Sequence, residues 1–280
     1  MSRILIVGGS GFIGSDLAKY FVSRDYEVLI LDRVPPSTKV PSDLKVFIGS
    51  MGDREVLEKI GYVDYVVHSA WDFTEDPLTS IRENVLGTAS LLEWCKRISV
   101  KHIVFLSSTV VYGEPVSELV KEDHPLLIER SRNRLHALTK LIVEKMISYY
   151  YHEYGIPYTI FRIWWSFNDE RIPGRTYREL LQKIKRCETI ELLRGSGGSI
   201  VYNDDLAKAV EKSINTSSSI GEIFNIASFF IEWSSIVEYI IKKTNSCAQI
   251  KFVESWRGPG FLEGRWFLDV SKLRQKLGLY

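Results

Sequence analysis

Close to the N-terminus, an apolar run leads directly into three regularly spaced glycines, and this feature constrains the fold more than any other. Residues 4–7, Ile-Leu-Ile-Val, are consecutively apolar, which predicts a short strand buried on both faces. Gly8, Gly11 and Gly14 follow, and apolar residues at helical spacing begin at Phe12. The pattern predicts a strand, a tight glycine turn and a helix whose N-terminus can hold a pyrophosphate.

A second predicted strand, residues 27–31, ends in Asp32, 18 residues after Gly14. A carboxylate at this place can accept hydrogen bonds from the ribose hydroxyls of a dinucleotide. A glycine turn followed by a chance aspartate is the weaker interpretation. Asp32 would repel a ribose 2′-phosphate, although Arg33 could pair with one. We therefore expect NAD in preference to NADP.

Composition and length exclude several classes of protein. The 280 residues carry 25% charged side chains and a net charge of +1, which indicates no attraction to nucleic acid or to a membrane surface. No apolar run approaches the length of a membrane span, and the first strand begins too early to leave room for a signal peptide. We expect a soluble, cytoplasmic protein. Cys95, Cys187 and Cys247 are isolated, without the spacing of a disulfide framework or a metal site.

Strand and helix patterns alternate through residues 1–165. Further strands are expected at 44–48, 64–68, 102–106 and 157–163, with helices at 54–60, 77–98 and 131–154. This alternation predicts an α/β fold with a Rossmann-type, doubly wound parallel sheet that forms the dinucleotide-binding domain. Asp53 precedes the 54–60 helix, where it can cap the helix or contact the adenine amino group.

After Trp165 the alternation becomes less regular. Helices are expected at 177–187, from 204, at 233–243 and at 271–277, with strands at 222–226 and 250–253. Residues 195–199, Gly-Ser-Gly-Gly-Ser, predict a flexible loop. We expect residues 166–280 to form a smaller α/β substrate-binding part, packed on the first, with some chain crossing back.

Several motifs along the chain resemble those of the extended short-chain dehydrogenase/reductase family, of the NAD-dependent sugar epimerase/dehydratase type. They are GGSGFIG at 8–14, VVHSA at 66–70, NVLGT at 84–88, FLSSTVVYG at 105–113, VYNDDLA at 201–207 and DVSK at 269–272. The resemblance implies NAD as cofactor and a small hydroxylated molecule as substrate. The residues that we expect to contact the cofactor are Gly8, Gly11, Phe12, Ile13, Gly14, Asp32, Arg33, Asp53, Ala70, Asn84 and Lys140.

The resemblance also implies a catalytic Ser, Tyr and Lys, but the tyrosine is missing. Ser108 and Lys140 match the family pattern, and the tyrosine position, four residues before the lysine, holds His136. His136 and Lys140 share a helix face, and the nearby ammonium disfavours an imidazolium, so a neutral His136 can accept a proton. A vestigial, purely polar role for His136 is the other interpretation.

The substrate side departs from the family in two more places. Trp165 stands where nucleotide-sugar enzymes usually carry an asparagine, and Gly198 stands where they carry a phosphate-binding arginine. Arg257 matches the second phosphate-binding arginine of the family. We expect Ser108, Trp165 and Arg257 to contact the substrate, with ordinary core packing of Trp164 and Trp165 as the alternative.

The resemblance thus predicts an NAD-dependent epimerase or oxidoreductase acting on a nucleotide sugar or similar molecule. The alternative is a catalytically weak dinucleotide-binding sensor or regulator. No metal is expected. The family pairs two helices with those of a second copy, so we also expect a homodimer. Apolar residues beyond the needs of one sheet face support it: Leu91, Trp94, Leu138, Leu141, Ile142, Ile147 and Tyr150.

Overall fold

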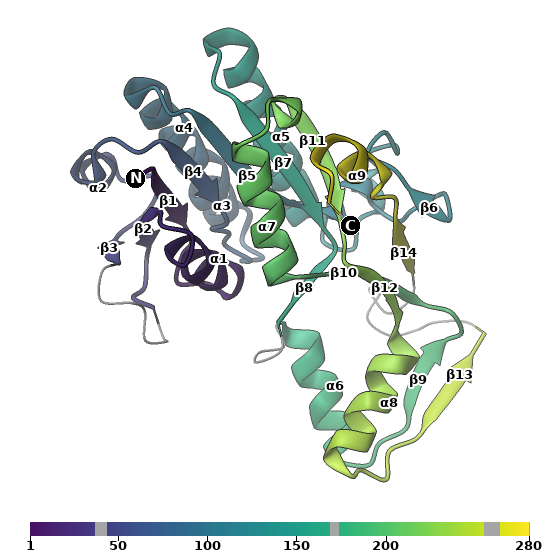
Figure 1. Cartoon of the computed structure of the whole chain (residues 1–280). Coiled ribbons are helices and arrows are strands. Elements are labelled where there is room, and N and C mark those ends of the chain that lie inside the picture. Colours follow the sequence, from purple (N-terminus) through teal and green to yellow (C-terminus); the bar gives the residue numbers. More distant parts are fainter. Residues whose placement is uncertain (37–43, 169–173, 255–263, 280) are drawn as a thin grey trace.

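A seven-stranded parallel sheet forms the centre of the molecule (Figure 1). The structure, a computed structural model, describes residues 1–36, 44–168, 174–254 and 264–279. The strand order is β11-β7-β5-β4-β1-β2-β3, which confirms the Rossmann-type doubly wound sheet. The strands are β1 (Arg3–Val7), β2 (Glu27–Asp32), β3 (Lys45–Ile48), β4 (Tyr65–His68), β5 (His102–Ser108), β7 (Tyr158–Ile163) and β11 (Glu222–Ile226).

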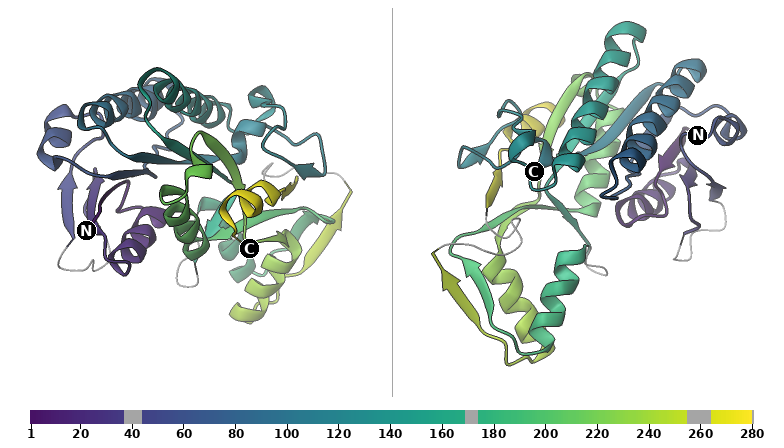
Figure 2. Two further views of the ribbon diagram at one scale, coloured as in Figure 1. Left: turned by 45° about the horizontal axis from the view of Figure 1, so that its top comes forward. Right: turned by 180° about the vertical axis from the view of Figure 1, so that it is seen from behind.

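Helices cover both faces of this sheet because successive strand residues point to opposite sides. Ile4 and Ile6 pack under α1 (Phe12–Val22), α7 (Asn203–Ile214) and α9 (Ser271–Leu277). Leu5 and Val7 belong to the core on the other face, which is covered by α2 (Arg54–Ile60), α4 (Gly87–Ile98) and α5 (Arg134–Tyr154). On that face α4 and α5 lie side by side (Figure 2).

Three of the residues that suggested a dimer are instead part of this core. Leu91, Trp94 and Ile147 are almost fully buried between the helices and the sheet. Their apolar character is therefore explained without a second copy. The expectation that they exceed the needs of one sheet face was wrong for these three, because α4 and α5 cover a wide area of sheet.

The predicted helix over residues 77–98 exists but is not uniform. It consists of α3 (Pro77–Ser80), a π-helical segment (Ile81–Leu86) and α4. The Thr88 hydroxyl donates to the carbonyl of Asn84, 2.5 Å away, at the join of the π segment and α4. π-helical segments inside helices are often found at functional sites. Asn84, in this segment, lines the cleft described below.

Only the start of the glycine-serine run at 195–199 lies in a turn, and the rest does not form the expected loop. Gly197, Gly198 and Ser199 are buried and begin β10 (Gly197–Tyr202). This strand pairs with β8 (Trp165–Phe167), β12 (Phe229–Glu232) and β14 (Arg265–Leu268), the last of which also pairs with β6 (Leu119–Val120). A Cβ on Gly197 would lie 2.2 Å from the carbonyl oxygen of Ile231. The glycines permit close strand packing here, which a local pattern cannot distinguish from flexibility.

An outer lobe with its own small core projects from the smaller sheet formed by β6, β8, β10, β12 and β14 (Figure 1). It contains α6 (Arg175–Lys185), β9 (Ile190–Leu193), α8 (Trp233–Thr244) and β13 (Ile250–Val253). β11 and α7 also come from the C-terminal half of the chain, yet they complete the large sheet and one of its helical layers. None of the helices described here combines the length and the apolar character that crossing a membrane requires.

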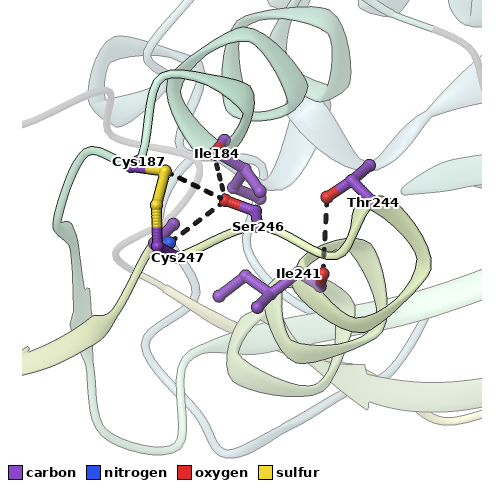
Figure 3. The surroundings of a disulfide bond; sticks show 7 residues. Ile184, Cys187, Ile241, Thr244, Ser246 and Cys247 are labelled. Carbon is purple, nitrogen blue, oxygen red and sulfur yellow. Dashed lines mark hydrogen bonds between the residues drawn. A yellow bond between two sulfur atoms is a disulfide. The ribbon is translucent and has the colours of Figure 1, made fainter.

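A disulfide joins Cys187 to Cys247 in this lobe (Figure 3). The expectation that these cysteines are isolated was therefore wrong. They are 60 residues apart in sequence, so no spacing motif relates them. The packing of α6 against α8 brings the end of α6 close to the segment before β13, where the Ser246 hydroxyl donates to the Ile184 carbonyl. Cys95 remains a free, buried thiol.

Reduction of this disulfide is expected to destabilise the lobe by about 2–4 kcal/mol, since an open chain of this length gains conformational freedom on unfolding. Thermal unfolding with and without dithiothreitol measures the effect. Cys187→Ser is the control: its melting temperature should equal that of the reduced wild type and should not respond to the reductant. Equal melting temperatures of oxidised and reduced wild type would contradict this expectation.

Candidate functional site

The glycine turn between β1 and α1 forms the floor of a cleft at the carboxyl edge of the sheet. Gly8 has a φ of +85°, a left-handed conformation that favours glycine. A Cβ on Gly14 would lie 2.1 Å from the Gly8 carbonyl oxygen, and one on Gly8 would lie 2.5 Å from the Ala70 nitrogen. Side chains at these positions would therefore fill the turn, and their absence leaves the helix N-terminus open to an anionic ligand.

Asp32 lies at the end of β2, beside this turn. Its carboxylate accepts hydrogen bonds from the backbone nitrogens of Ser10, at 3.0 Å, and Val34, at 3.2 Å. Arg33 points to other partners: its guanidinium lies 2.8 Å from the Asp72 carboxylate and 3.6 Å from that of Glu83. The cation that could have paired with a 2′-phosphate therefore already forms ion pairs with two carboxylates.

The cleft has a volume of about 650 Å³ and runs from the glycine turn across the ends of β4, β5 and β7. Asp53 is not among its lining residues, and it caps α2 instead by accepting from the backbone nitrogens of Glu55 and Val56. Arg257 lies outside the described residues. The other expected site residues all line the cleft: Gly8, Gly11, Phe12, Ile13, Gly14, Asp32, Arg33, Ala70, Asn84, Ser108, His136, Lys140 and Trp165.

Asn84 shapes the wall of the cleft that follows β4. Its side chain is fully buried and makes two hydrogen bonds with the backbone of Asp72, accepting at 2.8 Å and donating at 2.9 Å. This fixes the segment that carries Trp71 and Phe73, two lining residues that the sequence did not suggest. The only available signal for them was their position directly after a strand of the sheet.

Lys140 is held from two sides. Its ammonium nitrogen donates to the Leu106 carbonyl at 2.7 Å and lies 3.6 Å from the centre of the Trp71 ring. The residue is only 5% exposed, and burial lowers its pKa well below the usual value for lysine, an effect that Glu144 opposes. The side chain is thus fixed where β5 opens into the cleft.

His136 lies one helical turn before Lys140 and also faces the cleft. Its Nε2 atom is buried and has no hydrogen-bond partner, and its ring lies 5.9 Å from Trp71 and 5.2 Å from Phe73, measured between centroids. Burial, and secondly the charge of Lys140, lower the pKa of His136 to about 3. The imidazole is therefore neutral at physiological pH, as the sequence predicts.

Two serines end β5, and they differ in role. The Ser107 hydroxyl is buried and donates to the Glu144 carboxylate at 2.5 Å. Ser108 is partly exposed in the cleft, and its hydroxyl oxygen accepts a weak hydrogen bond from the Val110 nitrogen at 3.4 Å. Ser108 is therefore the serine available to a ligand, and it shares the cleft with His136 and Lys140.

Comparison with known proteins decides the family. Residues 4–227 match the family described as "NAD dependent epimerase/dehydratase family". The chain belongs to this family. A putative UDP-glucose 4-epimerase from Methanocaldococcus jannaschii is 31% identical over 238 residues, which cover 79% of this chain and 76% of that protein. A dTDP-D-glucose 4,6-dehydratase from Dictyostelium discoideum is 28% identical over 259 residues, 82% of this chain and 59% of that protein.

Solved structures share the fold of this epimerase/dehydratase family member at lower identity. An epimerase from Methanothermobacter thermautotrophicus superimposes with a TM-score of 0.86 at 21% identity, over 99% of this chain and 87% of that one. The enzyme WbmH from Bordetella bronchiseptica, solved with NAD⁺, gives 0.83 at 19% identity, over 100% and 93%. A UDP-glucose 4-epimerase from Thermotoga maritima, solved with UDP-glucose, gives 0.80 at 22% identity, over 99% and 93%.

A buried ion pair joins α5 to β7 in this family member. Arg162 on β7 and Glu144 on α5 are 3% and 2% exposed, and two hydrogen bonds of 2.7 and 3.0 Å join them. Burial acts to lower the pKa of Arg162, but the hydrogen bonds and the charge of Glu144 outweigh it and raise that pKa. Glu144 follows Lys140 by one helical turn. The Arg162–Glu144 ion pair therefore fixes α5 to β7 close to the part of the helix that lines the cleft.

Trp164 and Trp165 lie at the other end of the cleft. Their position allows contact with a substrate and also gives them a part in core packing, the two alternatives considered for them. Both line the cleft, and both pack against Trp233 of the outer lobe, with ring centroids 5.7 and 5.3 Å apart. Trp164 also occupies the space next to Gly198, where a Cβ would lie 2.5 Å from its indole. In the part of the chain that the structure describes, no group of three His, Cys, Asp or Glu residues could hold a metal ion.

Proposed function

We propose that this protein is an NAD-dependent epimerase or oxidoreductase that acts on a hydroxyl-bearing carbon of a nucleotide sugar or similar small molecule. The observation that carries the proposal is the buried, unpartnered Nε2 of His136 in the same cleft as Lys140, Ser108 and the glycine turn. In the tautomer that carries its hydrogen on Nδ1, this ring nitrogen would be a proton acceptor for a ligand. Residues 166–280, together with Trp165 directly before them, would supply most of the substrate contacts.

The glycine turn fits NAD. Any Cβ at Gly8 or Gly14 would occupy the turn, so its space suits a pyrophosphate at the N-terminus of α1, with a ribose beside Asp32. The family description and the NAD⁺ complex of WbmH support this choice. When bound, NAD supplies a hydride acceptor.

The chain's own residues would handle the proton. Ser108 would donate a hydrogen bond to the reacting oxygen of the substrate, and Nε2 of His136 would accept the proton of the hydroxyl group. Burial, and secondly the charge of Lys140, would keep the imidazole neutral, and Lys140 would hold the ribose next to the reacting carbon. Trp71, whose ring lies beside His136, would help to exclude water from this region.

The second candidate is a dinucleotide-binding protein with weak or no catalysis, which senses redox state or regulates a partner. The low pKa of His136, about 3, favours it, because an imidazole that resists protonation so strongly is a poor base at neutral pH. Both candidates share the cofactor site, and they differ only in turnover.

A turnover assay separates the two. The protein is incubated with NAD⁺ and a panel of nucleotide sugars, free sugars and small hydroxylated ketones, and NADH formation and epimerised products are measured. Turnover that needs His136 supports the enzyme. If neither the wild type nor His136→Tyr turns over any member of the panel while NAD binds normally, the regulatory candidate replaces it.

NAD is expected to bind at least about tenfold tighter than NADP, a difference of about 1.4 kcal/mol. The reason is that the Asp32 carboxylate would repel a 2′-phosphate, while Arg33 is engaged in ion pairs with Asp72 and Glu83. Calorimetric titration of both cofactors measures the ratio. Asp32→Ser should narrow it, and equal or tighter binding of NADP by the wild type would refute the assignment.

We further propose a homodimer that uses the outer face of α5. Leu138 and Tyr149 are 41% and 53% exposed, and a shallow apolar hollow lies between them along the helix. Ile81 and Leu86, on the neighbouring π segment, are also exposed. The residues that line the hollow on α5 are Leu138, Leu141, Ile142, Lys145, Met146 and Tyr149. Exposed apolar faces of this kind commonly bind a second copy.

Leu138→Glu is expected to convert the dimer to a monomer, because a carboxylate buried in an apolar interface costs about 2 kcal/mol or more. Light scattering at micromolar concentration measures the mass. Tyr239→Glu, at a 55% exposed position on α8, is the matched control and should leave the dimer intact. A monomeric wild type would refute the proposal.

A further inference from the structure

The disulfide between Cys187 and Cys247 joins the far ends of two helices that begin beside the cleft. α6 follows Gly174, which lines the cleft, and ends two residues before Cys187. α8 begins at Trp233 and ends three residues before Cys247. The two helices pack against each other (Figure 1). At 11 and 12 residues, each carries the disulfide about 16–18 Å away from its own start.

The near end of α8 meets the tryptophans of the cleft. Trp233 is almost fully buried and packs against Trp164 and Trp165, which line the cleft. We call these three residues the tryptophan wall. The wall shares the core of the outer lobe with Leu180 and Ile184 of α6. Because a close-packed core transmits displacements, the spacing of α6 and α8 bears on the position of the wall.

The disulfide is placed for reversible exchange with thiols. Both cysteines are exposed (Figure 3), and exposed disulfides are more easily reduced than buried ones. Cys187 has a φ of +58°, a left-handed conformation that residues with a side chain rarely adopt. The Glu188 nitrogen donates to the Lys183 carbonyl at 3.1 Å, which closes an end of α6 for which glycine is usual. Reduction removes one of the constraints on this disfavoured backbone.

Other contacts would keep the reduced lobe folded. The Ser246 hydroxyl donates to the Ile184 carbonyl, and the Ile190 nitrogen donates to the Gln249 carbonyl at 2.8 Å. β9 and β13 pair along their lengths directly after this contact. None of these three interactions uses a sulfur atom. Reduction should therefore loosen the lobe without separating its parts, and the two cysteines stay close enough to form the disulfide again.

We propose that Cys187 and Cys247 form a redox switch, which a dithiol reductant opens to release the tryptophan wall from its fixed position. A thiolate of the dithiol attacks one sulfur, breaks the S–S bond and forms a mixed disulfide, and the other cysteine leaves as a thiolate. The second thiolate of the dithiol then displaces the remaining cysteine. The dithiol becomes a disulfide, and two electrons and two protons pass to the cysteines. An effect on turnover rests on the proposed function, but the release of the wall does not.

The test follows backbone hydrogen exchange by mass spectrometry in the full chain, first oxidised, then reduced with dithiothreitol, then reoxidised with oxidised glutathione. Reduction should speed exchange in residues 164–167 and 233–240 at least about tenfold, because these segments lose packing, and reoxidation should restore the original rates. Residues 3–22, which contain the glycine turn, should exchange equally in all three samples. Any turnover found with the substrate panel should be slower in the reduced form, since a displaced wall orients a substrate less well.

Two variants serve as controls. Cys187→Ser combined with Cys247→Ser removes the switch, so it should exchange like the reduced wild type and should not respond to dithiothreitol. Cys95→Ala removes a buried free thiol and keeps the disulfide, so it should respond as the wild type does. The comparison of oxidised and reduced wild type needs no variant.

Three results would overturn the proposal. The first is equal exchange of residues 164–167 and 233–240 in the oxidised and reduced forms. The second is faster exchange confined to residues 183–190 and 245–253, which would make the disulfide a local brace. The third is reduction by dithiothreitol only after unfolding in urea. Failure of the proposed function is distinguishable, because a protein without turnover whose wall responds to reduction keeps the switch and loses the enzyme.

Discussion

His136→Phe is expected to reduce turnover at least about 10²-fold while leaving NAD affinity nearly unchanged, since a positioned base contributes about 10²–10⁴-fold. Phenylalanine preserves the ring contacts with Trp71 and Phe73 but provides no proton acceptor. The glycine turn and Asp32 are separate from the substitution, so the cofactor should bind as before. Steady-state kinetics together with calorimetric titration of NAD measure both effects.

Two further variants make this test specific. Lys140→Ala should weaken both turnover and NAD binding, because Lys140 is assigned to the ribose as well as to the imidazole. His136→Tyr should restore a phenol at this position and increase activity if the space beside Trp71 admits it. Unchanged turnover in His136→Phe would remove His136 from the reaction.

The pH profile follows from the same residue. Only the neutral imidazole accepts a proton, and with a pKa of about 3 it stays neutral above about pH 3. Titration of His136 should therefore cause no loss of kcat/KM between pH 8 and pH 5. An acidic limb near the ordinary histidine pKa of about 6.5 that disappears in His136→Tyr would contradict the burial of this side chain.

Glu144→Ala is expected to destabilise the protein by about 3–5 kcal/mol, because it leaves the Arg162 guanidinium buried without its partner. It also removes the acceptor of the Ser107 hydroxyl. Urea unfolding measures the free energy difference. Glu191→Ala breaks a similar contact with Lys251, 3.0 Å long but mostly exposed, and should cost less than about 1 kcal/mol.

A small effect of Glu144→Ala would mean that water or a rearranged side chain satisfies Arg162. In that case Glu144→Ala and Glu191→Ala would lower the free energy of unfolding by the same amount within error. A large effect with unchanged turnover per folded molecule would show that the pair supports α5 without tuning Lys140. Lower turnover per folded molecule would assign it a positioning role.

The cofactor half of the site was predictable because its signals are local. A buried strand, a turn that only glycine can form and a helix follow one another within residues 3–22, and Asp32 ends the next strand. The alternation of such units determines a parallel sheet with two helical layers. His136 and Lys140 were placed on one face of a helix by their spacing alone. That helix, capped by Asn133, begins at Arg134, three residues later than expected.

Long-range packing decided the features that the sequence left open or predicted wrongly. Asp53 caps a helix, and Gly197 to Ser199 lie in a buried strand. Cys187 forms a disulfide with Cys247, 60 residues away in sequence. Trp71 and Phe73 reached His136 from a distant segment, and Trp164 filled the space beside Gly198. Sequence alone determined the glycine turn and the face shared by His136 and Lys140, since each depends on residues only a few positions apart, and the alternation of strands and helices indicated the class of sheet. The tertiary structure alone decided the environment of His136 and the tryptophan wall, because burial and close contact between distant segments have no local pattern.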